Sequence, residues 1–492
     1  MNESQNLLAA LPEIVLLVAT CCVLLIDAMV KGPRRVSPRA LAMVALIFPA
    51  AVLVAQIGGA QGTQYAFSDM YVADSLASLL KLCSIVAIAV TFVYAERYTA
   101  DRDIERGEFY TLALFSLLGQ MVLISAGNML VIYLGLELMT LPLYALSALR
   151  RDDTRGTEAA MKYYILGALA SGFLLYGMSM VYGGAGSLDL AEIAQRFDSG
   201  MVDPMVFTFG VVFIVAGIAF KFGAVPFHMW LPDVYDGTPT STTLLIAGAP
   251  EFAAFALAFR LLVEGLPGIA IDWQPMILVL AVASLVVGNI VAIAQTNFKR
   301  MLAWSTIAHI GFVLMGFLAG VVDGDDSFLA TAWSASLFYV IAYVLTTLGT
   351  FGIILLLSRK GFECDQIADL RGLNKRSPGL ALVLLALMFS LAGIPPFIGF
   401  YAKVAILAAV IDAGLVWLAV LAVIFALIGA FYYIRVVKTM YFEDPVESEP
   451  IEAGVGAVAT MAVNGLAVLV LGIVPGSLMA LCLEAIRVAL VT

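Results

Sequence analysis

Ionisable side chains stand at six positions inside long apolar stretches, and this placement is typical of proton chemistry within a membrane. They are Lys81, Glu137, Lys162, Lys221, Glu251 and Lys403. A charge at the centre of a bilayer costs about 2.5–3.5 kcal/mol on insertion scales, so six unpaired charges facing lipid would cost about 15 kcal/mol. We therefore expect pairing, hydration or function. Lys81 and Lys162 stand nearer the ends of their runs, where a lysine can also snorkel to the membrane surface.

Two of these lysines stand beside prolines. Pro226 follows Lys221 by five residues, and Pro395 and Pro396 precede Lys403. A proline removes one backbone donor and frees the carbonyl four residues earlier. Unwound backbone at membrane depth is tolerated only inside protein or beside a hydrated cavity. We predict a broken helix at both places, where the lysine can reach freed carbonyls and water; ordinary proline kinks are the alternative.

A buried amine and a mobile carboxylate can exchange a proton. A dry interior makes a lysine release its proton more readily, and a nearby carboxylate makes it hold the proton. We therefore expect that movement of Glu137 toward and away from Lys221 would load and unload a proton. A swing of about 3 pKa units corresponds to about 4 kcal/mol, which exceeds the cost of about 2.3 kcal/mol for moving one charge through 100 mV.

The composition confines the chain to one class of protein. Of the 492 residues, 62% are hydrophobic and 13% are charged, whereas soluble domains carry about 25% charged residues. The mean hydropathy is +1.01, and a net charge of −10 argues against a nucleic-acid binder. A helix that spans the bilayer needs about 20 apolar residues. We expect an all-α polytopic membrane protein with no room for a large soluble domain.

Residues that hold redox cofactors are scarce. The five cysteines form no C-x-x-C pair, which disfavours an iron–sulfur or zinc site. No glycine-rich nucleotide motif stands between a strand and a helix. The two histidines are His228, which follows a predicted break and is a candidate site residue or a structural one, and His309. We expect the chain to bind no metal and no cofactor of its own.

Fourteen apolar runs predict fourteen transmembrane helices. They lie at about 11–30, 39–58, 74–94, 108–126, 129–149, 158–182, 205–225, 240–262, 276–296, 301–322, 328–358, 379–410, 414–437 and 452–473. We expect a short surface helix at 187–197 and a mildly amphipathic, interfacial helix at 476–491. The first run is interpreted as a retained span, because no basic residue precedes Lys31 and a signal peptide has a basic start.

Loop cations predict how these helices are oriented. Of the 26 lysines and arginines, 19 fall in loops on one side of the arrangement, and only Arg196, Arg260 and Arg487 fall on the other. Basic loops are retained in the cytoplasm. We therefore expect both termini to lie outside the cytoplasm.

The order of lysine and proline reverses between the seventh and twelfth helices. Helices five apart cross the membrane in opposite directions, so the reversal favours two inverted five-helix repeats. We expect one transmembrane domain with four parts. These are three N-terminal helices at 1–94, a first repeat at 108–262, a second repeat at 276–437, and a C-terminal helix with an interfacial tail at 452–492.

Five blocks of sequence are similar to a known family. They are EFYTLALFSLLGQMVLISAGNMLVIYLGLELMTLPLYALSAL (108–149), MKYYILGALASGFLLYG (161–177), GIAFKFGAVPFHMWLPDVYDGTPTSTT (217–243), NFKRMLAWSTIAHIGFVLMG (297–316) and LRGLNKRSPGLALVLLALMFSLAGIPPFIGFYAK (370–403). In these blocks the chain resembles the antiporter-like membrane subunits of respiratory complex I, the proton-pumping NADH–quinone oxidoreductase. The first two blocks look more like its subunit N than its subunits M or L.

The resemblance implies roles for individual residues. The family's fifth-helix glutamate matches Glu137, its sixth-helix lysine Lys162, and its seventh-helix lysine Lys221. Its tenth-helix histidine matches His309, and its twelfth-helix lysine matches Lys403. The implied role is a proton relay, in which His309 titrates nearest to neutral pH. The alternative for His309 is a core histidine with satisfied hydrogen bonds.

One position departs from the family pattern. The eighth helix of the family usually reads A-P-K or S-K, whereas residues 249–251 of this chain read A-P-E. The central lysine is therefore a glutamate of opposite charge, and a hop from Lys221 through a central lysine is in doubt. We expect Glu251 to belong to the relay, to pair with Lys221 or Lys403, and to pass protons as an acid.

The resemblance implies a proton-translocating membrane-arm subunit without a redox site of its own. The whole complex is expected to use NADH, FMN, iron–sulfur clusters and a quinone such as ubiquinone. The expected partners are the other antiporter-like and small membrane-arm subunits, the lipid bilayer and protons, with no nucleic acid. Two alternatives stay open: a subunit of a multisubunit sodium–proton antiporter, and a structural membrane subunit that does not pump.

Overall fold

Helices form nearly all of the structure, because backbone groups inside a bilayer must satisfy one another. The computed structural model describes residues 3–30, 37–58, 62–102, 104, 107–150, 152–320, 328–445, 451 and 454–490. The elements up to the eighth span are α1 (Glu3–Ala9), α2 (Leu11–Met29), α3 (Pro38–Gly58), β1 (Gln64–Ala66), β2 (Tyr71–Ala73), α4 (Ser75–Asp101), α5 (Gly107–Ile124), α6 (Met129–Ser147), α7 (Thr154–Ala185), α8 (Leu190–Asp198), α9 (Pro204–Phe222), α10 (Trp230–Gly237), α11 (Thr240–Ala247), α12 (Pro250–Ala258) and the π-helix η1 (Phe259–Gly265). The remaining elements are the 3₁₀-helix η2 (Pro267–Ile269), α13 (Ala270–Ile293), α14 (Phe298–Leu318), α15 (Leu329–Leu357), the 3₁₀-helix η3 (Ile367–Leu370), α16 (Leu373–Arg376), α17 (Pro378–Ala392), α18 (Ile398–Asp412), α19 (Val416–Phe442), α20 (Val455–Ile473) and α21 (Gly476–Leu490).

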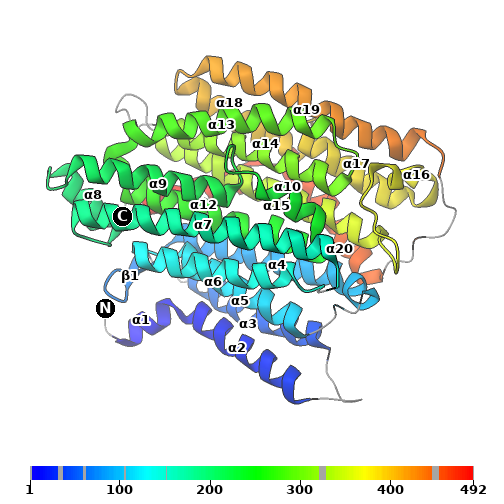
Figure 1. Ribbon diagram of the computed structural model, residues 1–492, viewed down its shortest axis with the longest axis horizontal. Helices are drawn as coiled ribbons and strands as arrows, with labels where there is room; N and C mark the ends of the chain where they lie inside the picture. Colours follow the sequence, from blue (N-terminus) through cyan, green and yellow to red (C-terminus); the bar gives the residue numbers. More distant parts are fainter. Residues whose placement is uncertain are drawn as a thin grey trace.

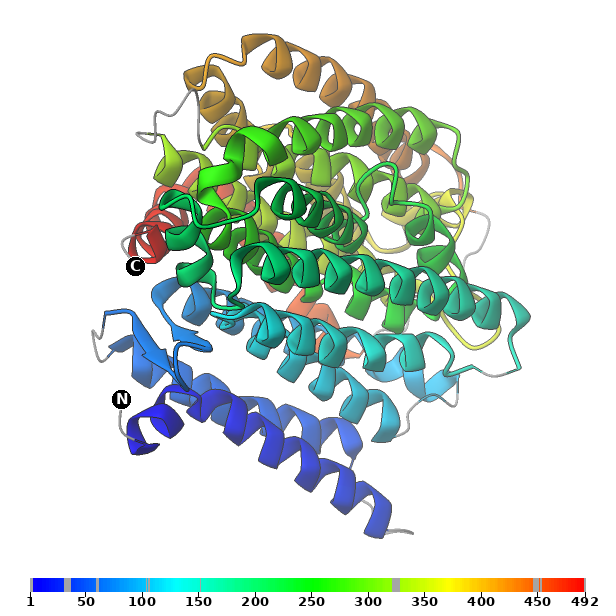
Figure 2. The same ribbon diagram turned by 60° about the vertical axis from the view of Figure 1, so that its left-hand side comes forward.

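The long helices run roughly parallel and lie side by side (Figure 1). Helices α2 and α3 form one edge of the bundle, and α18 and α19 lie toward the opposite edge (Figures 1 and 2). The span from α11 to η1 and the helices α14 and α15 are almost wholly buried. These three therefore form the centre of the bundle, where a charged side chain is farthest from lipid.

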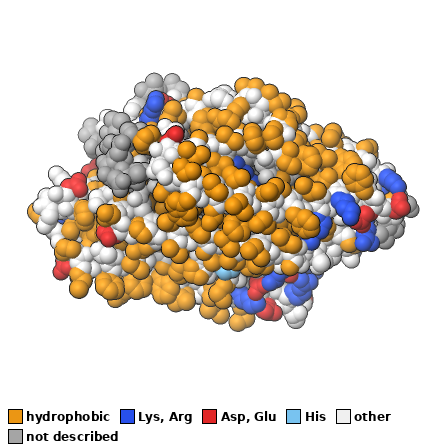
Figure 3. All heavy atoms as spheres, turned by 90° about the horizontal axis from the view of Figure 1, so that it is seen from above, with side chains coloured by type: hydrophobic (Ala, Val, Ile, Leu, Met, Phe, Trp, Pro, Cys, Tyr) orange, Lys and Arg blue, Asp and Glu red, His pale blue; other side chains and the backbone are white. Residues whose placement is uncertain are grey.

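The expected all-α polytopic membrane fold is confirmed. In the described part of the chain, thirteen helices are long and apolar enough to cross a membrane. The predicted run at 379–410 is divided between α17 and α18. Figure 3 shows apolar side chains over the middle of one face, with most of the visible lysine and arginine side chains toward one end. The division into two inverted repeats and the side on which the termini lie stay predictions.

Local sequence signals explain where many helices begin and how closely they pack. A short polar side chain accepts hydrogen bonds from the first turn of several helices, which satisfies donors that have no partner within the helix. These residues are Asp74, Asn128, Asp153, Asp189, Asp203 and Asn297. Between α7 and α9, a Cβ atom on Gly177 would lie 2.6 Å from the carbonyl oxygen of Gly210. The two backbones touch there, as small residues allow in membrane bundles.

Two spans are interrupted where prolines predicted a break. Residues 223–229 separate α9 from α10, and residues 393–397 separate α17 from α18. A glycine with positive φ ends the first half of each span: Gly223 with φ 68° and Gly393 with φ 82°. A residue with a Cβ rarely adopts this left-handed conformation, so glycine is the usual residue at this position of a helix end. Both predicted broken helices are confirmed.

A third interruption divides the predicted run at 240–262. Helix α11 ends before Gly248, whose φ of −102° and ψ of −105° leave the helical region. Pro250 starts α12, where its missing N–H is not needed. The apolar pattern had predicted one continuous span here. A single glycine followed closely by a proline is a weak signal inside a uniformly apolar run, and neighbouring helices decide whether the backbone breaks there.

Several small elements complete the bundle. The strands β1 and β2 form an antiparallel hairpin in which Tyr65 pairs with Val72, and the sequence analysis did not predict it. Helix α8 lies where a short helix was expected at 187–197. Helix α21 corresponds to the predicted helix at 476–491 and packs against α15 and α4; its interfacial position stays a prediction.

Lys81 does not snorkel, contrary to one expectation. Its Nζ atom lies 2.5 Å from Oε1 of Glu13 and donates a hydrogen bond of 2.8 Å to the hydroxyl of Tyr71. That hydroxyl donates in turn to Glu13 Oε2 at 2.9 Å. The Lys81 and Glu13 side chains are only 3% and 8% exposed. The snorkelling interpretation was wrong because a carboxylate from α2, far away in the sequence, neutralises the amine inside the bundle.

The loop assignment of some cations also needs correction. Arg260 was counted as a loop residue, but it lies on η1, is fully buried and forms ion pairs with Asp74 and Glu264. Lys299 is also buried and donates to the carbonyl of Thr238 at 2.7 Å. Five cations of the orientation count lie outside the described residues: Lys31, Arg34, Arg35, Arg106 and Arg151.

Replacing Glu13 with alanine tests the buried ion pair. Glu13→Ala leaves the Lys81 charge buried without a carboxylate, and loss of one partner of a buried pair costs about 3–5 kcal/mol. We expect a lower thermal unfolding temperature of the purified protein complex. Glu3→Ala, at an exposed position on α1, should leave the unfolding temperature unchanged. Equal unfolding temperatures for both variants would contradict the importance of the pair.

Candidate functional site

Lys221 stands in the last turn of α9, just before the first interruption. It borders a cavity of about 20 Å³ between α6, α7, α9 and α10, together with Thr140, Tyr144, Ser171 and Trp230. A space of this size holds about one water molecule. A helix C-terminus carries partial negative charge, so this end of α9 is a favourable place for an ammonium group. The amine therefore lies at a polar, hydratable point inside apolar surroundings.

Glu251 lies in the first turn of α12, just after the third interruption. The residue is buried, and its Oε2 atom has no hydrogen-bond partner among the described residues. Lys221 interacts with it electrostatically, and α12 packs against α9. A helix N-terminus carries partial positive charge. The acid and the amine thus stand at helix ends of opposite polarity, each end matching the charge that it holds.

Lys403 occupies the second predicted break. Its Nζ atom donates hydrogen bonds to the carbonyl oxygens of Leu391, at 2.9 Å, and Ala392, at 3.0 Å. These are the last carbonyls of α17, which have no partner within the helix. The interruption brings the backbone so close that a Cβ atom on Gly393 would lie 2.8 Å from Cδ of Lys403. The missing side chain of glycine therefore leaves room for the lysine.

His309 lies on the buried helix α14 and contacts one tyrosine from α15 and one from α19. Its Nδ1 atom is 2.7 Å from the hydroxyl of Tyr339, and its Nε2 atom is 3.0 Å from the hydroxyl of Tyr433. A hydroxyl can donate or accept, so both bonds persist whichever ring nitrogen carries the proton. His309 and Lys403 border the same small cavity, of about 10 Å³. Both ring nitrogens of His309 are hydrogen-bonded, which is compatible with a relay histidine and with a core histidine.

Tyr343 interacts with both Glu251 and His309. The ring centroids of Tyr343 and His309 are 5.3 Å apart, and the Tyr343 hydroxyl is 2.7 Å from Oγ1 of Thr306. Tyr343 also interacts electrostatically with Glu251. Tyr343, Tyr339 and Tyr433 were not predicted as site residues, although Tyr339 and Tyr343 stand four residues apart on α15, a spacing that places them on one face of the helix.

Glu137 lies apart from this group of residues. It stands half-buried on α6, where it interacts electrostatically with Tyr133 and Tyr144. It forms no ion pair with Lys221 among the described residues, although Tyr144 borders the Lys221 cavity. The structure therefore brings Lys221 to Glu251 and leaves Glu137 one side chain away from the cavity.

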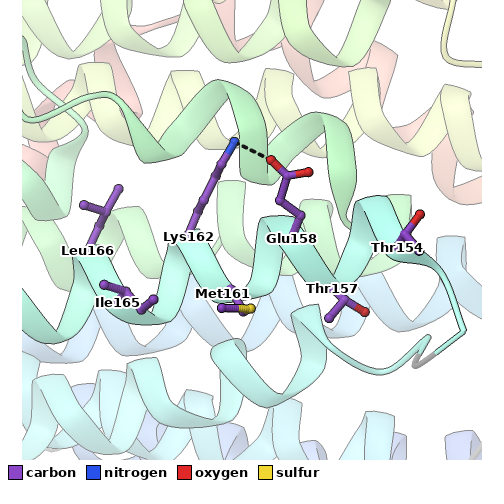
Figure 4. Close-up of a pocket in the computed structure, with 7 residues that line it drawn as sticks. All are labelled: Thr154, Thr157, Glu158, Met161, Lys162, Ile165 and Leu166. Carbon is purple, nitrogen blue, oxygen red and sulfur yellow. Dashed lines mark ion pairs between the residues drawn. The ribbon is translucent and has the colours of Figure 1, made fainter.

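Lys162 lies at the edge of the bundle, in an ionic network. Its Nζ atom is 2.9 Å from Glu158 and 2.7 Å from Asp233 of α10, and its side chain is 42% exposed. Figure 4 shows Lys162 and Glu158 pointing to the same side of α7, next to a groove of about 670 Å³. Asp233 also pairs with Arg300 of α14, at 2.9 Å. Through this carboxylate, Lys162 is tied to the second half of the interrupted seventh span.

Glu363 extends this network outside the membrane spans. Its carboxylate accepts hydrogen bonds from Tyr98 at 2.9 Å and Thr240 at 2.6 Å, and pairs with Arg102 at 2.7 Å. Burial opposes its charge, but Lys299, Arg102 and the two hydrogen bonds together hold the pKa of Glu363 below its usual value. Glu363 therefore stays ionised and anchors the start of α11, the helix that leads to Glu251.

The remaining candidates lie in the two breaks. Pro226 stands between α9 and α10, and Pro395 and Pro396 stand between α17 and α18. The ring of His228 lies 5.2 Å from the ring of Trp304, and its Nδ1 atom has no hydrogen-bond partner among the described residues. The prolines therefore mark the breaks, and His228 contacts an aromatic ring and interacts with the backbone of Pro226 in the first break.

Fold and site together define a class: a polytopic membrane protein whose interrupted helices carry buried acids and amines. Residues 126–429 match the family model described as NADH:quinone oxidoreductase/Mrp antiporter, TM. The chain is 56% identical to the protein named NADH-quinone oxidoreductase subunit N of Herminiimonas arsenicoxydans, and the match covers 98% of this chain and 99% of that one. The chain therefore belongs to the NADH-quinone oxidoreductase subunit N family.

Solved structures agree with this assignment. A chain of respiratory complex I from Thermus thermophilus is 31% identical, with a TM-score of 0.80 over 95% of this chain and 98% of that one. A chain of the Mrp complex from a Dietzia species has a TM-score of 0.84 over the whole of both chains, but it is only 20% identical. The second similarity shows the fold alone, which both kinds of complex share.

A glycine substitution tests how Lys403 is held. Gly393→Ala places a methyl group on Lys403 and a Cβ in the left-handed region, where an ordinary residue costs about 1–2 kcal/mol. Gly414→Ala is the matched control, because Gly414 has a φ of 76° but open space around it. We expect both variants to unfold at a lower temperature and Gly393→Ala to lose clearly more stability. Equal losses would show that the lysine is not held against Gly393.

Proposed function

We propose that the chain moves protons across the membrane through a relay of buried ionisable residues, as a subunit of NADH–quinone oxidoreductase. The observation that carries the proposal is the electrostatic interaction of Lys221 with Glu251, since the two residues stand at helix ends of opposite polarity. A proton that passes from the amine to the carboxylate neutralises both. Movement of either helix end changes which of the two holds the proton.

Side chains continue from Glu251 toward the second half of the molecule. Tyr343 interacts with both Glu251 and His309, and His309 shares a cavity with Lys403. The proposed order is therefore Lys221, Glu251, His309 and Lys403, with hydroxyl groups and about one water in each cavity bridging the gaps. The glutamate takes the place of the usual central lysine, so the proton is passed there by an acid.

The two remaining candidates act on the ends of the relay. Glu137 is proposed to modulate Lys221 by moving toward its cavity, because the two are not paired in this structure. Lys162 is proposed to act through Asp233, which it shares with Arg300. A shift of this shared carboxylate would move α10 and so the break beside Lys221.

The chemistry that drives the relay belongs to other subunits. NADH, FMN, iron–sulfur clusters and the quinone are proposed to bind elsewhere in the complex, and the chain contacts other membrane-arm subunits and lipid. In the described part of the chain no group of three or more metal-ligating side chains occurs. The location proposed is the bacterial inner membrane, with both termini outside the cytoplasm.

The central glutamate gives the sharpest test of the relay. Glu251→Gln keeps the shape of the side chain but cannot take up or release a proton. In vesicles containing the assembled enzyme, we expect NADH oxidation to lose its coupled proton pumping. Glu108→Gln is the matched control, since Glu108 also stands in the first turn of a helix but is exposed. Unchanged pumping in Glu251→Gln would remove this residue from the relay.

The first half of the relay is tested with Lys221→Ala and Glu137→Ala. Both variants should lower proton pumping and coupled quinone reduction together while the complex still assembles, because the relay and the redox reaction are linked. Full pumping in both variants would reject the mechanism and favour a structural subunit. A sodium-dependent pH change in vesicles without NADH would instead favour the sodium–proton antiporter, whose fold is shared.

A further inference from the structure

A second buried ionic cluster lies away from the proposed relay, at the end of the eighth span. The guanidinium of Arg260, on η1, stands between two carboxylates. Its Nη2 atom is 2.7 Å from Oδ2 of Asp74, and its Nη1 atom contacts Oε1 of Glu264. The Arg260 and Asp74 side chains are 1% and 0% exposed, and that of Glu264 is 19% exposed. The single guanidinium of Arg260 therefore pairs with two carboxylates in nearly dry surroundings.

The count of charges leaves one carboxylate in excess. Arg260 is always protonated, so it balances one negative charge. The buried amine of Lys81, on the same helix α4 that Asp74 caps, is already paired with Glu13. Two carboxylates that share one cation in a low-dielectric site repel each other, and such a site favours protonation of one of them. The cluster is neutral when it holds one proton.

Helix ends decide which carboxylate takes that proton. Asp74 is the N-cap of α4 and accepts a hydrogen bond of 2.6 Å from the backbone N–H of Ala77. The positive end of a helix dipole and this bond both favour the ionised form. Glu264 lies at the C-terminal end of the span formed by α12 and η1, where the dipole opposes a negative charge. Asp74 therefore stays ionised, and Glu264 is the member that is protonated.

Of the three residues in the cluster, Glu264 lies closest to the surface. It is the most exposed member of the cluster, and the next turn of the chain carries the exposed Gly268. Of the elements packed against η1, α12 carries Glu251, η2 carries no charged residue, and α8 carries Glu192, Arg196 and the exposed Asp198. Glu192 and Arg196 pair with each other, so they leave the charge of the cluster unbalanced. Water at this end of the bundle can reach the Glu264 carboxyl.

We propose that Glu264 is an additional protonation site of this chain, which holds one proton against the Arg260–Asp74 pair and exchanges it with water at the end of the bundle where α1 lies. The π-helical turn supports this assignment, since such turns occur frequently at functional sites. The site is separate from the Lys221–Glu251–His309–Lys403 relay and does not depend on its correctness.

Infrared difference spectra of the assembled complex test the site directly. Spectra recorded between alkaline and acidic buffers contain the carbonyl band of each carboxyl group that takes up a proton, and the band shifts in D₂O. We expect Glu264→Gln to lose the band of one carboxylic acid. Glu192→Gln is the matched control, because Glu192 also pairs with an arginine four residues away but on an exposed helix, and it should leave that band in place.

A second variant keeps the test decisive if Glu264→Gln assembles poorly. Glu264→Asp retains a carboxyl group at the same position of the chain, so the band should shift rather than disappear. The proposal is overturned if the spectra of Glu264→Gln and the unchanged protein contain the same carboxyl bands, or if Glu264→Asp leaves every band unmoved. These outcomes do not depend on proton pumping, so failure of the proposed relay would leave them interpretable.

Discussion

The arrangement depends on one constraint: a helix that ends inside apolar surroundings leaves backbone groups without partners. Three spans end and restart within the bundle, and each interruption is matched by a side chain of the appropriate sign. Lysines stand at carbonyl ends, where Lys403 donates to Leu391 and Ala392, and Glu251 stands at an amide end. The interruption and the charge each reduce the free-energy cost of burying the other. Neither would persist in this interior alone.

Between these charged residues, the polar side chains have most of their hydrogen bonds satisfied. His309 is held by two tyrosine hydroxyls, and cavities of about 20 and 10 Å³ leave room for about one water each. A wider channel would let protons leak, whereas a fully dry interior would block them. In the proposed relay, hydroxyls and single waters would allow transfer only when the charged ends are correctly placed, which is what a coupled pump requires.

Ionic clusters near the two ends of the bundle have a different character. The Lys81–Glu13 pair and the Arg260–Asp74 pair join helices that are far apart in the sequence. At the other end, Asp233 joins Lys162 of α7 to Arg300 of α14. These contacts fix the outer ends of the helices.

Short-range patterns in the sequence determined the class of protein, the approximate spans and the two proline breaks, because these depend on composition and neighbouring residues. That Glu251 is an unusual acid followed only from the resemblance to the complex I subunits. Tertiary structure alone decided that Glu13 neutralises Lys81 and that Glu137 stays apart from Lys221. It also decided that Gly248 interrupts a third span and that tyrosines surround His309. Each of these depends on contacts between helices tens or hundreds of residues apart. A uniformly apolar sequence does not encode which faces of its helices meet.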